Sequence, residues 1–276
     1  MIFGSALPNP IALSVGAFGI RWYALIIVSA IVAGFSITRR MARQQGIQDE
    51  TVWDILLFTI PAAIIFGRLA FVLSHLPLYY TFKDTLKIWE GGISSHGTIL
   101  GGLLVIVLIA WKRRISFWML MDIIVPGAVL AQAIGRWGNY MNQEAFGPPT
   151  NLPWAVPIQP SLRPDRYANF DYFHPTWLYE SIWNLVVFVV LLLLFKRVRH
   201  KPGVLAAIYF LLYYAGRFVL EFFRLDTVFV GAVRFTTYLS IAVMIVAVSV
   251  LIARMRRAPQ TFEDIETIQT NKQGTA

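Results

Sequence analysis

Arginines in two parts of the chain have neighbours and spacings that could do chemistry. Arg136 stands in the segment GRWGNYMNQEAFG, residues 135–147, which also contains two asparagines, a glutamine and a glutamate. Arg217, Glu221 and Arg224 follow one another at i, i+4 and i+7, which places them on one face of a helix. Arginine suits a phosphate because its planar fork donates two parallel hydrogen bonds and remains charged. The two segments therefore predict a site for an anionic group.

The segment around Arg136 favours a functional interpretation. Its glycines let the backbone turn sharply or approach a ligand closely. The alternative is a helix C-cap made of glycine and asparagine. Because a cap requires neither an arginine nor a glutamate, the combination points to a binding or reaction site.

A histidine and two tyrosines are weaker candidates. His96 lies in GGISSHGTILGG, residues 91–102, near the start of a predicted helix that Ser94 or Ser95 could cap. The helix dipole favours the neutral, basic form of a histidine there, although a structural histidine fits this segment equally well. Tyr213 extends the face of Arg217 by one turn, and Tyr23 is also typical of an aromatic belt at a membrane interface.

The chain that must position these residues has the composition of a membrane protein. Of its 276 residues, 57% are hydrophobic and 14% are charged, against about 45–50% apolar and about 25% charged in soluble domains. Several apolar stretches exceed the length of about 18 residues that indicates a membrane-spanning helix. Seven such stretches are predicted, at Ala17–Thr38, Val52–Ser74, Ile93–Trp111, Phe117–Ile134, Trp177–Phe195, Val204–Phe222 and Phe235–Ala253.

Basic residues predict the orientation of these helices. Clusters of lysine and arginine follow the first, third, fifth and seventh stretches, so all four lie on one side of the membrane. The positive-inside rule makes that side cytoplasmic, with the N-terminus outside and the C-terminus inside. The same distribution accounts for the net charge of +9 without nucleic acid as a partner.

The predicted fold is an all-α polytopic membrane protein. Residues 1–258 form its membrane domain, and the proline-rich residues 140–176 form a small extracytoplasmic cap, with short strands around Trp154–Ile158. The polar residues 259–276 are predicted to be a disordered cytoplasmic tail.

Charges within the apolar stretches predict where the site opens. A charged side chain at the centre of a membrane helix costs about 2.5–3.5 kcal/mol on insertion scales and usually faces a cavity. Some charged residues cannot be explained as anchors at helix ends. All of these lie toward the predicted outer side, which indicates one site open to the outer leaflet. They are Arg21, Arg68, His96, Arg136, Glu180, Arg217, Glu221 and Arg224.

The absence of cysteine restricts the chemistry. Without cysteine the chain has no disulfide, thiolate metal site or cysteine nucleophile, so any reacting thiol belongs to a substrate. The four histidines lack the spacing of a metal site, and no glycine-rich nucleotide loop follows a strand. These patterns therefore favour neither a metal site nor nucleotide binding.

Four segments together resemble the prolipoprotein diacylglyceryl transferase family. They are GRWGNYMNQEAFG, SHGTILGG, HPTWLYE (residues 174–180) and YYAGRFVLEFFR (residues 213–224), in the order of that family. The resemblance extends from Arg21 to Arg224. One departure is TILGG after His96–Gly97, where a second glycine is expected.

The resemblance implies a transferase of the bacterial cytoplasmic membrane. It implies that the diacylglyceryl group of phosphatidylglycerol moves to the lipobox cysteine of a prolipoprotein signal peptide. The products are a thioether and glycerol 1-phosphate, in the first step of lipoprotein maturation, and the resemblance implies no metal or organic cofactor.

The resemblance also implies roles for individual residues. Arg136 and Arg217 are candidates to hold the phosphate, and His96 is the candidate base, although Glu144 or a substrate-assisted path could replace it. Glu144 is also expected to orient Arg136. Binding or positioning roles fall to Tyr23, Asn139, Gly147 and Tyr213, while Glu221 and Arg224 brace the lipid entrance.

Two other functions are compatible with intramembrane arginines. A transporter of an anionic solute predicts inverted repeats and a site at the bilayer midplane, whereas this sequence shows no repeat and its charges lie outside the midplane. A non-catalytic lipid-binding protein predicts that loss of His96 leaves lipid affinity unchanged.

Overall fold

In the part of the chain that the computed structural model describes, seven helices are long and apolar enough to cross a membrane, which confirms the predicted all-α polytopic fold. The structure describes residues 2–4, 7–15, 18–76, 82–87, 91–225, 229–230 and 233–257, so the predicted tail lies outside the described part. The spanning helices are α1 (Trp22–Gln44), α2 (Asp49–Ser74), α4 (Ser95–Arg113), α5 (Phe117–Asn142), α6 (Thr176–Val198), α7 (Val204–Leu220) and α8 (Phe235–Met255).

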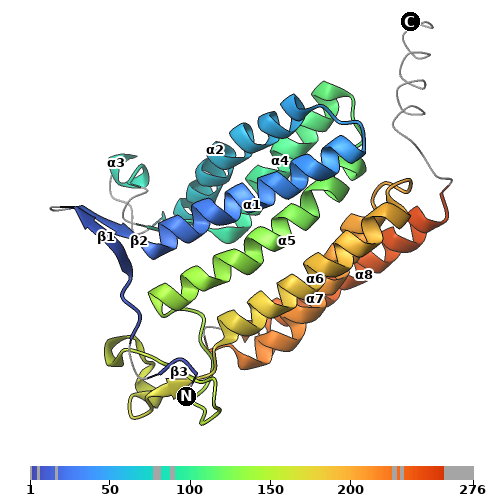
Figure 1. Ribbon diagram of the computed structural model, residues 1–276. Helices are drawn as coiled ribbons and strands as arrows, with labels where there is room; N and C mark the ends of the chain where they lie inside the picture. The colour runs from blue at the N-terminus through green and yellow to red at the C-terminus, as the bar shows by residue number, and fades with distance from the viewer. Residues whose placement is uncertain are drawn as a thin grey trace, which may run out of the picture. The chain divides into compact units, whose positions relative to one another are not determined.

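The chain forms two compact units, shown in Figure 1. The first contains Met1–Thr38 with Ile124–Pro259, and the second is built on Arg39–Ile123. In the second unit α2 and α4 lie side by side. A Cβ atom on Gly97 would lie 2.3 Å from the Phe66 carbonyl oxygen, so glycine is what lets these two backbones approach so closely.

Arg68 of α2 has a structural role in the second unit. Its buried guanidinium donates hydrogen bonds to backbone carbonyls of the connection between α2 and α4, which also contains the short helix α3 (Phe82–Thr85). The acceptors are the carbonyls of Thr85 at 2.8 Å, Gly91 at 2.6 Å, and Gly92 and Asp84 at 3.1 Å each. Arg68 therefore anchors a loop, and these bonds account for a charge that the sequence left unexplained.

The first unit contains α6, α7 and α8, with α7 packed against both neighbours (Figure 1). The first part of α1 contacts α5 within this unit. A Cβ atom on Gly34 would lie 2.8 Å from the Gly127 carbonyl oxygen. Small residues allow this close approach, which is a common way of joining helices in membranes.

Short antiparallel strand pairs accompany the helices. β1 (Ile11–Val15) pairs with β2 (Phe18–Arg21), β3 (Val156–Pro157) with β4 (Tyr172–Phe173), and β5 (Phe229–Val230) with β6 (Val233–Arg234). The prediction of short strands around Trp154–Ile158 is therefore confirmed. The predicted start of the first helix at Ala17 is wrong, because β2 uses residues up to Arg21 and α1 begins at Trp22.

Two other predicted boundaries are wrong for a shared reason. Helix α5 continues eight residues beyond Ile134, through GRWGNYMN to Asn142, so Arg136 lies within the helix. Helix α7 ends at Leu220, and Glu221–Phe223 forms the 3-10 helix η5, which leaves Arg224 just outside it. Apolarity marks the part of a helix that lipid surrounds, whereas backbone hydrogen bonds decide where the helix ends.

Residues 143–175 connect α5 to α6 and have a core of their own. They include the 3-10 helices η3 (Pro160–Leu162) and η4 (Asp165–Tyr167). Val156, Ile158 and Phe173 are buried against Trp177 in the first turn of α6. The Trp177 ring also packs on Tyr140 of α5, with 5.0 Å between ring centroids. This core fixes the connection to the ends of both helices.

Candidate functional site

The centre of the candidate site is Glu180, in the second turn of α6. Its side chain is only 3% exposed, and it forms ion pairs with three arginines. Glu180 Oε2 lies 2.5 Å from Arg136 Nη2, while Oε1 lies 2.7 Å from Arg217 Nη1 and 3.3 Å from Arg224 Nη1. The structure thus brings Arg136 and Arg217, which the sequence selects as phosphate ligands, onto one carboxylate.

The local packing explains why these residues meet. The Ser181 hydroxyl, next to Glu180, donates a buried hydrogen bond of 2.8 Å to the Ala133 carbonyl of α5. Ala133 lies three residues before Arg136 on α5. This bond therefore fixes the position of α6 along α5, with Glu180 close to Arg136. Contacts between α6 and α7 bring Arg217 to the same carboxylate.

The electrostatic balance of this cluster favours an anion. A buried carboxylate is costly unless charged or polar partners compensate it, and three guanidinium groups do so here. Even together with Glu221, which lies 3.8 Å from Arg217, Glu180 does not neutralise three arginines, and their side chains remain 24%, 16% and 18% exposed. The local field is therefore suited to a phosphate next to Glu180.

Glu221 forms a second carboxylate beside Arg217. It is 1% exposed, and its Oε2 lies 3.8 Å from Arg217 Nη2. At that distance the pair is ionic but not hydrogen-bonded, and Oε2 has no hydrogen-bond partner among the described residues. The Glu221 carbonyl accepts a bond from Arg234 Nη1, whose guanidinium lies over the Phe222 ring. Glu221 thus links the end of α7 to the start of α8.

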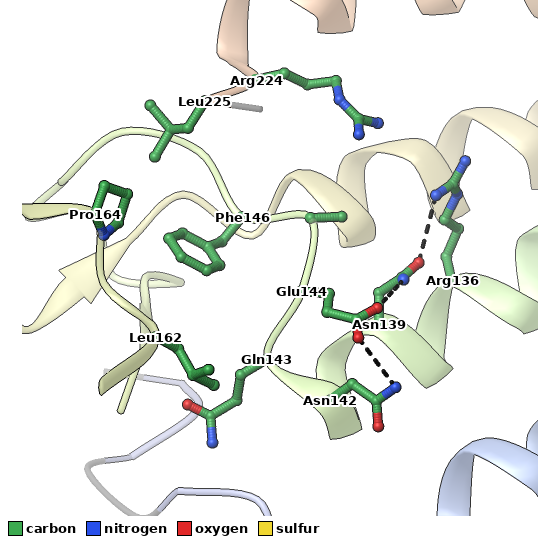
Figure 2. A pocket seen from close by; sticks show the side chains of 11 residues that line it. Arg136, Asn139, Asn142, Gln143, Glu144, Phe146, Leu162, Pro164, Arg224 and Leu225 are labelled. Carbon is green, nitrogen blue, oxygen red and sulfur yellow. Dashed lines mark hydrogen bonds between the residues drawn. The ribbon is translucent and has the colours of Figure 1, made fainter. Parts of the chain in front are cut away.

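A network of amides and one carboxylate lies beside Arg136, as Figure 2 shows. Arg136 Nη1 donates to Asn139 Oδ1 at 3.4 Å, and Asn139 Nδ2 donates to Glu144 Oε2 at 3.3 Å. Asn142 Nδ2 donates to Glu144 Oε1, also at 3.3 Å. Glu144 therefore reaches Arg136 through Asn139.

The backbone after α5 adopts unusual conformations that direct these side chains. Gln143 and Ala145 have φ of 54° and 53°, in the left-handed region that is uncommon for residues other than glycine. The Ala145 carbonyl accepts bonds from the Thr176 hydroxyl and from the Trp177 N–H. The start of α6 therefore holds this turn, and such conformations concentrate at functional sites.

Gly147 occupies a position without space for a side chain. A Cβ atom there would lie 2.6 Å from the Phe223 carbonyl oxygen, 2.9 Å from Thr176 Cγ2 and 3.0 Å from His174 Cβ. Phe223 belongs to η5, between Glu221 and Arg224. Gly147 therefore lets the α5–α6 connection touch the segment that carries two of the charged residues.

The two candidate tyrosines also lie in the first unit. The Tyr23 ring covers Gly138, where a Cβ atom would lie 2.7 Å from Tyr23 Cδ2. Tyr213 lies one turn before Arg217 on α7 and stacks on Tyr209, with ring centroids 5.6 Å apart. Tyr23 thus lies against α5 at Gly138, the residue before Asn139, and Tyr213 lies on α7 one turn from Arg217.

A pocket of about 580 Å³ opens beside this cluster (Figure 2). Arg136 and Arg224 point into the same region from different elements. One part of the lining is polar and another is apolar. The polar residues are Arg136, Asn139, Asn142, Gln143, Glu144 and Arg224, and the apolar ones are Ala145, Phe146, Leu162, Pro164 and Leu225.

Sequence reasoning counted Glu180 among the unexplained charges but assigned it no role, whereas it assigned His96 the role of base. Glu180 was visible only as a charge in an apolar helix within HPTWLYE, and its three partners lie 37 to 44 residues away along the chain. His96 lies in the first turn of α4, in the second unit. Its participation stays a prediction.

Fold and site together define a class: a polytopic membrane protein with an arginine-lined, amphipathic pocket at the end of a helical bundle. A family model described as prolipoprotein diacylglyceryl transferase matches residues 10–253. The chain belongs to that family.

Curated relatives agree with this assignment. A phosphatidylglycerol–prolipoprotein diacylglyceryl transferase of Thermosynechococcus vestitus is 42% identical over 231 residues, 83% of this chain and 86% of the relative. Proteins of the same name from Gloeobacter violaceus and Thermotoga petrophila are 41% and 38% identical. Those matches cover 87% and 93% of this chain, and 90% and 89% of the relatives.

Proposed function

We propose that this protein transfers the diacylglyceryl group of phosphatidylglycerol to the cysteine thiol of a prolipoprotein signal peptide. The observation that carries the proposal is the convergence of Arg136, Arg217 and Arg224 on Glu180 beside an amphipathic pocket. The names of the relatives support the choice of lipid and protein substrates. The absence of cysteine in the chain is consistent with a substrate thiol as nucleophile.

During the reaction the phosphate group gains negative charge, and the arginines are placed to stabilise it. The thiol loses its proton, its sulfur bonds to the terminal glycerol carbon of the diacylglyceryl group, and the bond from that carbon to the phosphate oxygen breaks. The electron pair of that bond leaves with glycerol 1-phosphate, so a phosphodiester with one negative charge becomes a monoester with more. Donors that are already oriented toward this phosphate stabilise the transition state more than the ground state.

Glu180 keeps those donors in place. Without a bound lipid, three neighbouring guanidinium groups repel one another, and their long side chains have many rotamers. The ion pairs with Glu180 reduce this freedom before the substrate arrives. The apolar part of the pocket, with Phe146, Leu162 and Leu225, is suited to the lipid part of the substrate next to the phosphate.

The proton of the thiol has three possible acceptors. A free thiol has a pKa of about 8.5, so a modest base is sufficient to form the thiolate. His96, Glu144 and an oxygen of the departing phosphate all meet this requirement. Asn139 and Asn142 hold Glu144 at the pocket.

The membrane context completes the proposal. The protein lies in the bacterial cytoplasmic membrane with its N-terminus outside, its C-terminus in the cytoplasm, and residues 140–176 forming the extracytoplasmic cap. The pocket then opens at the outer leaflet, where phosphatidylglycerol and an exported signal peptide are both present.

A transfer assay tests the function directly. Purified protein receives phosphatidylglycerol and a lipobox peptide, and mass spectrometry follows the thioether-linked peptide while an enzymatic assay follows glycerol phosphate. The same peptide with serine in place of cysteine is the control and is expected to give neither product. Absence of both products with every phospholipid tried would refute the transferase. Full activity of the double variant Arg136→Ala/Arg217→Ala would refute the assigned site.

A further inference from the structure

Trp183 of α6 forms an unusual contact with the backbone of α7. Its indole Nε1 donates a hydrogen bond of 2.9 Å to the Leu212 carbonyl oxygen. Within a regular helix this carbonyl already accepts the N–H of Gly216, four residues later. The indole therefore shares a carbonyl in the middle of a membrane helix, far from any helix end.

Gly216 makes this contact possible. A Cβ atom on Gly216 would lie 2.1 Å from Trp183 Nε1 and 2.2 Å from its Cδ1, so a side chain here would force the indole to move. The indole thus lies directly on the α7 backbone. Gly216 is the residue before Arg217, and Trp183 lies three residues after Glu180, so this contact flanks the ion pair between Glu180 and Arg217.

The contact fixes the register of the two helices. An indole N–H within lipid has a high cost unless it finds an acceptor, so the Leu212 carbonyl has to remain opposite Trp183. A slip of α7 by one residue shifts it by about 1.5 Å and rotates it by about 100°. That movement would place a side chain against the indole and turn Arg217 away from Glu180.

We propose that Trp183 and Gly216 are positioning residues that set the α6–α7 register and thereby hold Arg217 in the geometry that the reaction requires. The inference rests on the proposed transferase function. Neither residue lines the pocket, so both act through Arg217.

Two substitutions test the proposal in the full-length protein. Trp183→Phe removes the N–H donor and keeps an aromatic ring, and we expect kcat to fall about tenfold while KM for phosphatidylglycerol changes less than about twofold. The expected loss of kcat follows because a misplaced Arg217 weakens transition-state stabilisation, and misplacement by about 1 Å costs up to about 100-fold in rate. KM changes little because Arg136 and Arg224 still bind the lipid. Gly216→Ala is expected to lower kcat further, because its methyl group displaces the indole.

A compensating pair separates register from general stability. The double variant Gly216→Ala/Trp183→Phe relieves the clash and is expected to recover at least part of the kcat lost in Gly216→Ala. Matched controls are Trp111→Phe, at a side chain that is 80% exposed, and Gly102→Ala, where the nearest atom would lie 3.5 Å from the new Cβ. Both are expected to keep wild-type kcat.

The outcomes distinguish this inference from the function on which it depends. Wild-type protein without transfer activity contradicts the proposed function. An active wild type together with unchanged kcat in Trp183→Phe or Gly216→Ala overturns the positioning role. A double variant no faster than Gly216→Ala also overturns the proposal, and if Trp183→Phe cannot be purified, Gly216→Ala decides alone, with wild-type kcat as the contradicting result.

Discussion

At the scale of single residues, the site depends on unequal numbers of opposite charges. Glu180 is almost fully buried and has three guanidinium partners, so it holds the arginines without cancelling their charge. Removing one partner of a buried charge network is costly because it leaves the others uncompensated. Glu180 is therefore the residue whose loss we expect to affect both stability and activity.

Substitution Glu180→Gln tests this expectation. The amide keeps the shape of the side chain but removes the negative charge that orients Arg136, Arg217 and Arg224. We expect kcat to fall about 100-fold, because the donors to the phosphate lose their preorganisation, and the thermal unfolding midpoint to fall as well. The control Glu50→Gln, at an exposed position of α2, is expected to change neither quantity. A Glu180→Gln enzyme with wild-type kcat would show that the arginines need no internal carboxylate.

Gly147 gives a second test at this scale. The methyl group of Gly147→Ala would lie 2.6 Å from the Phe223 carbonyl oxygen, 2.9 Å from Thr176 Cγ2 and 3.0 Å from His174 Cβ. It therefore has to displace η5, which carries Glu221 and precedes Arg224. We expect at least about a tenfold loss of kcat/KM in the peptide transfer assay. Gly102→Ala is the matched control, and equal activity of the two variants would contradict a tight contact at Gly147.

At the scale of elements, a chain of polar side chains ties the α5–α6 connection to α6. Trp154 Nε1 lies 2.9 Å from the Tyr179 hydroxyl, which in turn lies 3.0 Å from His174 Nδ1. An indole N–H can only donate, so the Tyr179 oxygen accepts the bond from Trp154. The Tyr179 hydroxyl and His174 Nδ1 share the second bond, whose direction depends on the tautomer of His174.

The burial of His174 predicts that the stability of the protein depends on pH. Burial lowers the pKa of His174 below its ordinary value of 6.5, so the unfolded chain binds a proton at a higher pH than the folded protein does. Stability from neutral His174 is therefore complete above about pH 6.5 and is lost as the pH falls toward the lowered pKa. We expect the thermal unfolding midpoint to decrease as the pH falls below about 6.5. The variant His174→Gln is expected to show a smaller decrease, and an identical pH profile would contradict the assignment.

Arg68 shows how an element can use a charge for structure alone. Its four bonds to backbone carbonyls hold the connection that leads into α4. Arg68→Met keeps much of the side-chain volume but leaves those carbonyls without their donor. We expect faster proteolysis of the α2–α4 connection in detergent-purified protein, and unchanged proteolysis there would exclude this anchoring role.

At the scale of the whole molecule, the arrangement in the membrane is the property to test. The basic clusters predict the same cytoplasmic side for the ends of α1, α4, α6 and α8. Some of these residues also form contacts at helix ends: Arg39 and Arg43 both pair with Asp49, at 2.5 Å. Lys201 Nζ donates to the Met255 carbonyl at 2.9 Å, within the first unit.

The natural absence of cysteine provides a direct measurement of topology. Single cysteines replace exposed Gln159, in the α5–α6 connection, and exposed His200, after α6. A membrane-impermeant maleimide on intact cells is expected to label Gln159→Cys and to label His200→Cys only after permeabilisation. The reverse pattern would invert the proposed orientation and place the pocket at the inner leaflet.

The sequence by itself determined the class of fold and most of the candidate chemistry. Seven spanning helices follow from apolarity, which is a property of each stretch alone, and the arginine segments follow from residue types at short range. The boundaries at Trp22, Asn142 and Leu220 did not follow, because backbone hydrogen bonds and neighbouring segments decide where a helix begins and ends.

Only the tertiary structure decided which charges meet. Glu180, Arg136 and Arg217 come from three helices, and their meeting depends on contacts such as those of Ser181 with Ala133 and Trp183 with Leu212. Arg68 has a charge as unexpected in sequence as that of Arg136, yet it binds backbone carbonyls. A sequence shows that a charge requires a partner in the membrane, whereas packing between helices determines which partner it finds.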